Sequence, residues 1–266
     1  MSRLTNTRVR VNATVRVALC CASVVIALGA TAPPNPTAEQ LVAGAIDLTR
    51  GLSSYAQLKM TIHRPEWERS STLKAWTKGR GEALIRFVAP ARDAGNATLK
   101  QGDNMWTFTP KLNRVVRLPF SMMSQSWAGS DLSYKDLSRT DDLLKYYDLE
   151  LTGTEELEGH TVFTIVALPH DDAPIVWGKE VMRLRDDYVL LSQTFFDQSA
   201  EPKALKRLEA LDVGDMGGRT FATRMRMTDL EEGEHWTELE YLEARFDVEL
   251  ADSLFTVFSL ESGKEP

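Results

Sequence analysis

Apolar and polar residues alternate at every second position through much of this chain. Ala56, Leu58, Met60 and Ile62 are separated by polar residues, and the stretch from residue 83 to residue 89 alternates in the same way. A period of two is typical of a β-strand with one buried face. We therefore expect strands over 56–63, 83–89, 149–157, 161–168, 180–185, 188–196, 205–213, 219–228 and 235–245. Two further strands are expected, one before and one after residues 102–104.

Turn-forming residues separate these alternating runs. They include Gly102-Asp103-Asn104, Glu158-Gly159 and Gly217-Gly218. Such sequences are typical of the tight turns of β-hairpins. Ten or so strands joined by short turns predict one large antiparallel sheet, curled or barrel-like, in a single domain.

Helical spacing is confined to a few segments. Apolar residues recur every three or four positions from Leu41 to Leu52, with Thr37 as a predicted N-cap and Gly51 as a stop signal. Shorter helices are expected after Ser133 and over 251–254, and Ser133-x-x-Asp136 has the layout of a capping box. The fold class is therefore mainly β with few helices (α+β), within one domain at 33–262 followed by a tail at 263–266.

The first 32 residues have the pattern of a secretory signal peptide. Four arginines without an acidic residue precede an apolar run, 17–28, which ends in small residues. A retained N-terminal anchor is the alternative. Cys20 and Cys21 both lie in this segment, and Leu19 before Cys20 argues against lipid attachment. We therefore expect a cleaved, exported chain without cysteine, and hence without disulfides or thiol chemistry.

The charge of the chain argues against nucleic acid as a partner. The sequence has 31 basic and 38 acidic residues, a net charge of −7. Residues 1–32 contain four arginines and no acid, so their removal leaves a net charge of −11. An acidic protein is repelled by nucleic acid and by anionic membranes.

Catalytic and metal-binding motifs are weak. No two of the four histidines have metal-ligand spacing, and His170-Asp171-Asp172 is interpreted as an acidic loop rather than a cation site. Ser130 lacks the Gly-x-Ser-x-Gly pattern of a hydrolase nucleophile, so a turn or cap role is favoured. Carboxylates that are distant in sequence remain open as an acid–base pair. We expect no cofactor, no metal and no enzymatic activity.

Apolar groups, several of them methionines, suggest a binding cavity instead. If the sheet curls over its one long helix, the space between them can remain partly open, and Met-rich walls adapt to guests of irregular shape. The alternative for each residue is an ordinary place in the core. The predicted lining residues are Met60, Ile62, Ile85, Phe87, Trp106, Phe108, Met122, Met123, Trp127, Met182, Met225 and Met227.

Several runs of residues carry a family resemblance that extends over about 38–262. These runs are Arg86-Phe87-x-x-Pro90-Ala91-Arg92-Asp93-x-Gly95, Trp106-x-Phe108-x-Pro110, Arg114-Val115-x-Arg117, Gly129-Ser130-Asp131-Leu132-Ser133-Tyr134-x-Asp136-Leu137 and Ala251-Asp252-Ser253-Leu254-Phe255-Thr256. They resemble the LolA-like group of outer-membrane lipoprotein-sorting proteins. Gly129, Ser130, Asp131, Tyr134 and Asp136 form the most specific block.

The resemblance implies an unclosed antiparallel β-barrel covered by helices, with an apolar cavity for acyl chains, in a Gram-negative-type periplasm. It also implies a strand arginine that locks the lid of the cavity, for which Arg86, Arg114 and Arg117 are the candidates. Members of the group look like carriers of lipoproteins or lipids, some of them alongside membrane transporters.

Three hypotheses follow. The leading one is a monomeric periplasmic carrier or chaperone that binds the acyl chains of a lipid or lipoprotein. The second is a non-carrying soluble partner of an inner-membrane transporter or assembly machine. The third is an envelope hydrolase that uses Ser130 with a distant histidine.

Overall fold

The computed structural model describes residues 36–138 and 141–263, so the predicted signal peptide at 1–32 lies outside the described residues. The helices are α1 (Ala38–Arg50), α2 (Tyr134–Ser138), α3 (Asp142–Tyr146) and α4 (Val257–Ser262), with 3-10 turns η1 (Pro110–Leu112), η2 (Phe120–Met122) and η3 (Asp252–Phe255). The strands are β1 (Ser53–Arg64), β2 (Trp67–Lys78), β3 (Glu82–Ala89), β4 (Ala97–Gln101), β5 (Asn104–Thr109), β6 (Arg114–Arg117), β7 (Tyr147–Leu157), β8 (His160–Pro169), β9 (Lys179–Arg185), β10 (Leu190–Phe196), β11 (Ala204–Met216), β12 (Arg219–Asp229) and β13 (Trp236–Phe246).

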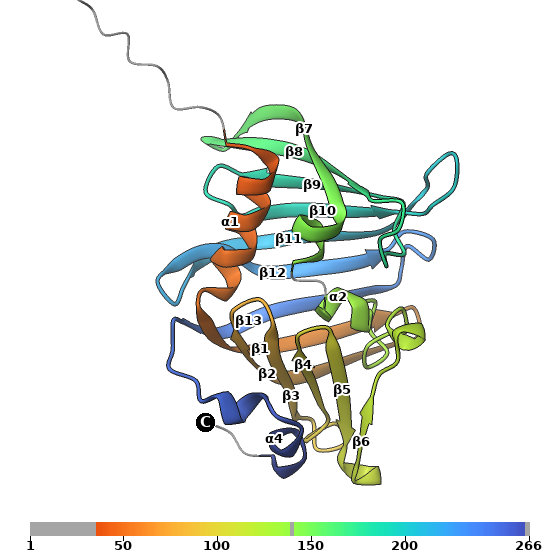
Figure 1. Cartoon of the computed structure of the whole chain (residues 1–266), viewed down its shortest axis with the longest axis vertical. Helices are drawn as coiled ribbons and strands as arrows, with labels where there is room; N and C mark the ends of the chain where they lie inside the picture. The colour runs from red at the N-terminus through yellow and green to blue at the C-terminus, as the bar shows by residue number, and fades with distance from the viewer. Residues whose placement is uncertain (1–35, 139–140, 264–266) are drawn as a thin grey trace, which may run out of the picture. The chain divides into compact units, whose positions relative to one another are not determined.

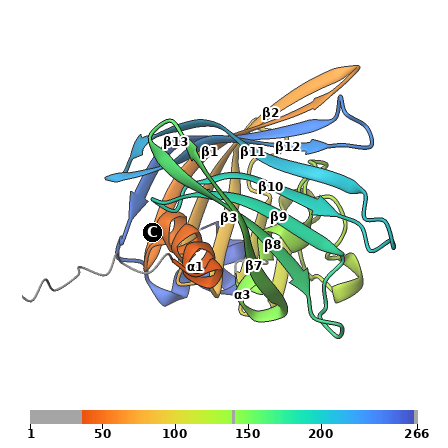
Figure 2. The same ribbon diagram turned by 90° about the horizontal axis from the view of Figure 1, so that it is seen from above.

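All the strands of the described residues belong to one antiparallel sheet of thirteen strands (Figure 1). Its order is β6-β5-β4-β3-β2-β1-β13-β12-β11-β10-β9-β8-β7, so two series of consecutive hairpins meet where β1 pairs with β13. β6 and β7 form the two free edges. The twist of the strands curls the sheet around α1 and α3 (Figure 2), and the two edges stay apart (Figure 1). The predicted unclosed antiparallel sheet is confirmed.

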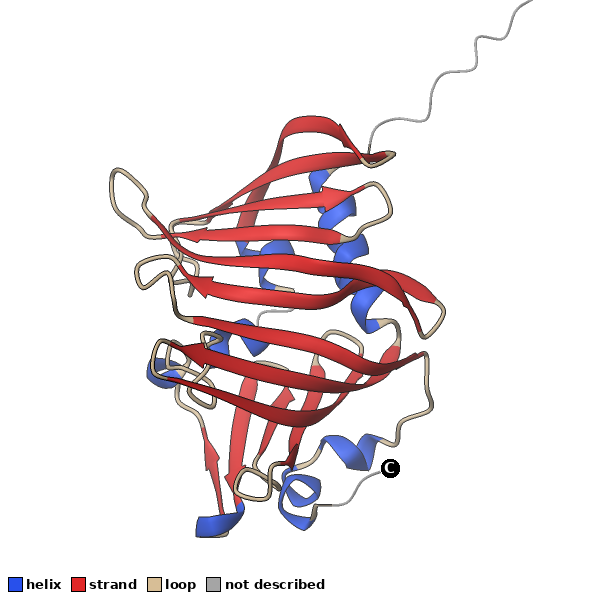
Figure 3. Ribbon diagram, turned by 180° about the vertical axis from the view of Figure 1, so that it is seen from behind, coloured by secondary structure: helices blue, strands red, loops and turns tan. Residues whose placement is uncertain are grey.

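The alternation along β1 separates two faces of the sheet. Leu58, Met60 and Ile62 belong to an inner cluster beneath the segment that joins β6 to β7. Tyr55 faces the other way, where Leu254 and Phe255 of the C-terminal segment cover the sheet. From behind, the strands lie in front of α1 (Figure 3). A long helix is therefore present on the inner face alone, among the described residues.

α1 begins and ends where the sequence predicts. Thr37 and Gln40 form a reciprocal capping box, with the Gln40 N–H donating to Thr37 Oγ1 over 3.2 Å. At the other end, Gly51 has φ +61 and donates its N–H to the Asp47 carbonyl over 2.8 Å. A residue with a side chain adopts this left-handed conformation at a cost, which explains the stop at glycine.

Strand β2 and the short helices α3 and α4 were not predicted, and the helix expected over 251–254 is the 3-10 turn η3. In β2, Ser71 takes an inward position and the remaining residues are largely polar, so the apolar alternation is weak. Strand β10 also begins two residues later than expected, because Tyr188 lies in a turn with φ +69. Pairing with β1 and β3 on both sides makes β2 a strand despite its composition.

Candidate functional site

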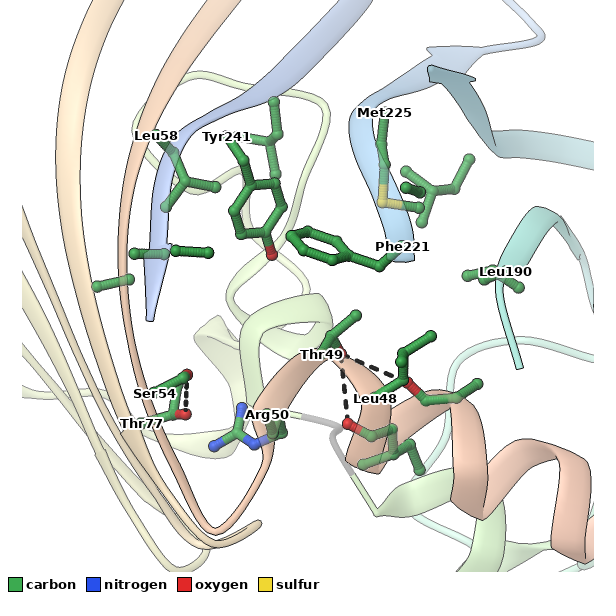
Figure 4. A pocket seen from close by; sticks show the side chains of 18 of the residues that line it. Leu48, Thr49, Arg50, Ser54, Leu58, Thr77, Leu190, Phe221, Met225 and Tyr241 are labelled. Carbon is green, nitrogen blue, oxygen red and sulfur yellow. Dashed lines mark hydrogen bonds between the residues drawn. The ribbon is translucent and has the colours of Figure 1, made fainter. Parts of the chain in front are cut away.

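A cavity of about 410 Å³ lies between α1 and the inner face of the sheet (Figure 4). Strands β1 to β3 line one side of it and strands β9 to β13 the other, so the two halves of the sheet meet around it. Leu137 of α2 and Leu143 of α3 contribute as well. The volume falls toward the lower end of the range of about 300–1,000 Å³ found for small-molecule sites. Its size therefore suits one slender ligand.

Helix α1 supplies one apolar wall of the cavity. Val42, Ala45, Ile46 and Thr49 line it, and their spacing of three and four residues places them on one helical face. Across the cavity, the rings of Phe221 and Tyr241 meet edge to face with centroids 5.0 Å apart (Figure 4). Most of the remaining lining residues are aliphatic, so the cavity is suited to hydrocarbon.

One end of the cavity is polar. Arg50 lines it from the last turn of α1, and burial lowers the pKa of its guanidinium to about 10. Burial also raises the pKa of the Tyr241 hydroxyl. The hydroxyls of Ser54 and Thr77 lie 2.6 Å apart in the wall nearby. At neutral pH this end therefore carries a cation and neutral hydroxyl groups.

Four of the twelve predicted lining residues meet at this cavity. They are Ile85, Trp127, Met182 and Met225. The other eight lie elsewhere. Met60, Ile62, Phe87 and Met227 are packed in the inner core cluster. Trp106 and Phe108 belong to the cluster covered by the C-terminal segment. Met122 and Met123 are half-buried in the loop after β6. Lipid contact by any of the twelve stays a prediction.

Sequence reasoning missed the residues of α1 and the pair of Phe221 and Tyr241. The available signal was the apolar face of α1: the cavity was expected between this helix and the sheet, but no residue of the helix was included in the predicted lining. Methionine content was a poor guide, because a methionine on the inner face contacts either the cavity or its neighbours, depending on its height along the sheet.

The Gly129-Ser130-Asp131 corner ties the segment after β6 to the sheet. Gly129 has φ +75, a backbone conformation that favours glycine. Ser130 is buried, donates its hydroxyl to the Trp127 carbonyl over 2.7 Å and accepts the Leu132 N–H over 3.2 Å. Within the described part of the chain, its hydrogen bonds go to backbone groups and not to a histidine. Its geometry is that of a turn residue.

Asp131 makes the strongest of these attachments. Its carboxylate accepts hydrogen bonds from both terminal nitrogens of Arg64, over 3.1 and 3.0 Å, and from the Thr237 hydroxyl over 2.6 Å. Its backbone carbonyl accepts a hydrogen bond from Lys206 over 2.8 Å. These partners lie on β1, β13 and β11, so a single residue fastens the segment across three strands.

The remaining block residues shape α2. Asp136 accepts the Ser133 N–H over 2.7 Å, and its own N–H donates to the Ser133 hydroxyl over 3.1 Å. The predicted capping box is therefore present. Tyr134 packs against the inner core cluster together with Leu137. The block thus places Trp127 and Leu137 against the cavity.

The three candidate lid arginines lie in different places. Arg86 is buried on the outer face, where it donates to the carbonyls of Ser259 and Leu260 over 3.1 and 3.5 Å. Arg114 and Arg117 are exposed on β6, and Arg117 bonds to Asn104.

Arg219 on β12 is a strand arginine that does reach α1. Its guanidinium donates to the carbonyls of Asp47 and Leu48, each over 2.9 Å, and pairs with Asp247. Arg80, in the turn after β2, pairs with the Asp47 carboxylate over 2.8 Å. The C-terminal turn of α1 is therefore held from two sides.

Ligand atoms of His160, Asp186 and Asp187 lie close enough together to hold a metal ion. Arg185 occupies the same cluster, however, and donates to His160 and Asp187 over 2.6 and 2.5 Å. The cluster is thus an ion-pair network at a turn rather than a built metal site. His170, which the sequence places beside two aspartates, lies 3.4 Å from Asp148.

Within residues 36–138 and 141–263, none of the helices combines the length and the apolar character needed to cross a membrane.

Sequence comparison gives one result at the family level. A family model described as "-like: Uncharacterized protein" matches residues 79–262, which is more than half of the chain. No curated protein shows a significant match to the sequence.

Solved structures give the fold independently. A DUF1329 family protein from Desulfovibrio piger is 25% identical, with a TM-score of 0.74 over 84% of this chain and 97% of its own. A domain from Vibrio parahaemolyticus named for outer membrane lipoprotein sorting is 23% identical, with a TM-score of 0.72 over 84% and 98%. A LolA superfamily protein from Nitrosomonas europaea is 19% identical, with a TM-score of 0.69 over 84% and 99%. The chain therefore belongs to the family of the matching model, and its fold is like that of the LolA superfamily protein and of the domain named for outer membrane lipoprotein sorting.

Proposed function

We propose that this protein is a periplasmic carrier that binds an acyl chain of a lipid or lipoprotein between α1 and the sheet and transfers it between envelope membranes. The observation that carries this proposal is the cavity of about 410 Å³, lined mostly by aliphatic and aromatic side chains. The family fold supports it, because the fold is shared with a domain named for lipoprotein sorting.

The energetics favour a hydrocarbon guest. Burial of an acyl chain contributes about 0.8 kcal/mol per methylene group, so ten buried methylenes represent about 8 kcal/mol before the costs of ordering. Release into a membrane then requires the cavity to open or a partner with higher affinity. Opening would begin at the last turn of α1, which polar contacts with Arg219 and Arg80 hold, because the first half of the helix is packed in a buried core cluster through Leu41 and Val42.

Catalysis is not part of this proposal. Ser130 is engaged by backbone groups of its own turn. Its role is to hold in place the segment that joins β6 to β7, called here the covering segment. The protein would thus act by binding and release.

Occupancy of the cavity is the direct test. Protein purified without detergent is extracted with organic solvent, the extract is analysed by mass spectrometry, and delipidated protein is titrated with a fluorescent fatty acid. We expect co-purified lipid and saturable binding. Empty protein that ignores the probe would overturn the carrier proposal.

A blocking variant links the binding to this cavity. Ala45→Phe places a ring in the cavity from α1, and Ala43→Phe makes the same change on the same helix at a position that does not line it. Loss of probe binding in Ala45→Phe, with retention in Ala43→Phe and similar thermal melting of both, is the expected result. Equal binding by both variants would place the ligand elsewhere.

A second function, docking to a membrane transporter, has its own observation. Leu112 and Phe120, on either side of edge strand β6, are 73% and 64% exposed, and Val116 on β6 is exposed as well. Capture of an inner-membrane protein by lipid-free protein, lost in the double variant Leu112→Ser and Phe120→Ser, would support it. Substitution of Asp131 or Asp136 would not test docking, because both residues hold the fold.

A further inference from the structure

The guanidinium of Arg50, at one end of the apolar cavity, is bonded in a way that the carrier role does not explain. Arg50 donates its Nε–H to the Gly79 carbonyl over 2.9 Å and one Nη2–H to the Glu82 carbonyl over 3.0 Å. A guanidinium has five N–H donors, so three remain. Among the described residues, no carboxylate lies within ion-pair distance of it. Arg50 therefore brings a net positive charge to the cavity wall.

A second cation lies close to the first. Lys100 of β4 is buried and donates its ammonium group to the carbonyls of Arg80 and Gly81 over 3.0 and 3.2 Å. Burial, together with the nearby charge of Arg50, lowers the pKa of Lys100. Two cations thus share the turn between β2 and β3, and both use backbone carbonyls as their hydrogen-bond partners. The distant charges of Asp103, Asp141 and Asp142 only partly offset them.

Hydroxyl donors complete this end of the cavity. The Tyr241 hydroxyl points into the pocket, on the side where Arg50 lies (Figure 4). Because burial raises its pKa, the hydroxyl keeps its proton at neutral pH and is able to donate it in a hydrogen bond. Ser54 and Thr77 share one hydrogen bond, which leaves one of their two protons for a ligand. Each of these groups is therefore able to donate a hydrogen bond to a ligand, and none of them is anionic.

We propose that Arg50, Tyr241 and the pair of Ser54 and Thr77 bind the oxyanion head of a single-chain amphiphile whose hydrocarbon tail fills the rest of the cavity. This inference rests on the proposed carrier function and names its ligand class. A carboxylate and a phosphate monoester share the required chemistry, since both accept charge-assisted hydrogen bonds from a guanidinium. The neighbouring Lys100 adds to the positive potential without lining the cavity.

The test compares ligands that share one acyl chain and differ in the head. Delipidated protein is titrated by calorimetry with palmitate, with palmitoyl lysophosphatidic acid and with neutral monopalmitin. We expect each anionic amphiphile to bind about 10- to 100-fold more tightly than monopalmitin, the range for hydrogen bonds to charged groups. The tighter of the two anions identifies the head.

Arg50→Met removes the charge and keeps much of the stem. It should abolish the preference for the anions while leaving the affinity for monopalmitin within about threefold, and Arg50→Lys should restore part of the preference. Arg80→Met is the control: it removes an arginine that holds the same end of α1 but does not line the cavity. This variant should keep the full preference.

The outcomes separate the two proposals. Equal affinity of the wild type for anionic and neutral amphiphiles refutes the head site and leaves the carrier function standing. An equal fall in all affinities in Arg50→Met shows that Arg50 only holds α1, and also refutes it. Failure of the wild type to bind any of the three ligands overturns both proposals.

Discussion

Removal of the Asp131 carboxylate should destabilise the whole fold. The Arg64 and Asp131 side chains are only 14% and 6% exposed, so the variant Asp131→Ala leaves a guanidinium desolvated and without a counter-charge. Breaking a buried ion pair by removing one partner costs about 3–5 kcal/mol. The Thr237 hydroxyl loses its acceptor at the same time.

Urea denaturation followed by tryptophan fluorescence gives the free energy of unfolding. A loss of about 3–5 kcal/mol also corresponds to a fall in melting temperature of roughly 6–20 °C for a domain of this size. The variant Arg64→Met together with Asp131→Ala should be more stable than Asp131→Ala alone, because the uncompensated charge is gone.

A surface pair provides the control. The side chains of Lys203 and Glu231 lie 3.0 Å apart but are 63% and 53% exposed, so Glu231→Ala should cost less than about 1 kcal/mol. If Asp131→Ala were equally mild, the pair of Arg64 and Asp131 would be an ordinary solvated bridge. The attachment of the covering segment would then have another source.

Three further predictions concern the cover of the cavity. A Cβ on Gly44 would lie 2.3 Å from the Tyr188 ring, so Gly44→Val should destabilise the protein by about 1–3 kcal/mol, and Tyr188→Gly should relieve this in the double variant, as measured by thermal melting. Ser130→Ala should cost about 1–2 kcal/mol in urea and leave any ester-cleaving activity of the preparation unchanged; loss of such activity would contradict the turn role. Arg219→Met removes the donor to two carbonyls of α1, so hydrogen exchange in the last turn of α1 should accelerate while that of β1 stays slow; unchanged exchange at Gly51 would refute this.

Local patterns were sufficient for most elements. The alternation of Leu58, Met60 and Ile62 reports a strand with one buried face wherever it occurs, and the cap residues Thr37 and Gly51 mark the ends of α1 by their own hydrogen bonds. Strand β2 was not predicted because it has no clear apolar alternation of its own. Its pairing with a strand on each side holds it in the sheet.

Local patterns did not show which residues line the cavity. Met60 and Met225 both lie on the inner face of a strand, yet Met60 is fully buried in the core and Met225 lines the cavity. A periodicity of two residues shows on which face of the sheet a side chain lies. It does not show the position of that side chain along the strand or its distance from α1. The arginine that contacts α1 shows the same limit. Arg219 is 169 positions from Arg50 in sequence and meets the same helix turn only through the pairing of β12 with β13 and of β13 with β1.

By itself, the sequence determined a mainly β chain with one capped helix and a Gly-Ser-Asp corner, because turns, caps and alternation depend on residues a few positions apart. The tertiary structure alone decided where the space between α1 and the sheet remains unfilled and that a cation lies at its end. Both depend on how two groups of strands, β1 to β3 and β9 to β13, are placed around the cavity. These groups are far apart along the chain and come together only when the sheet curls.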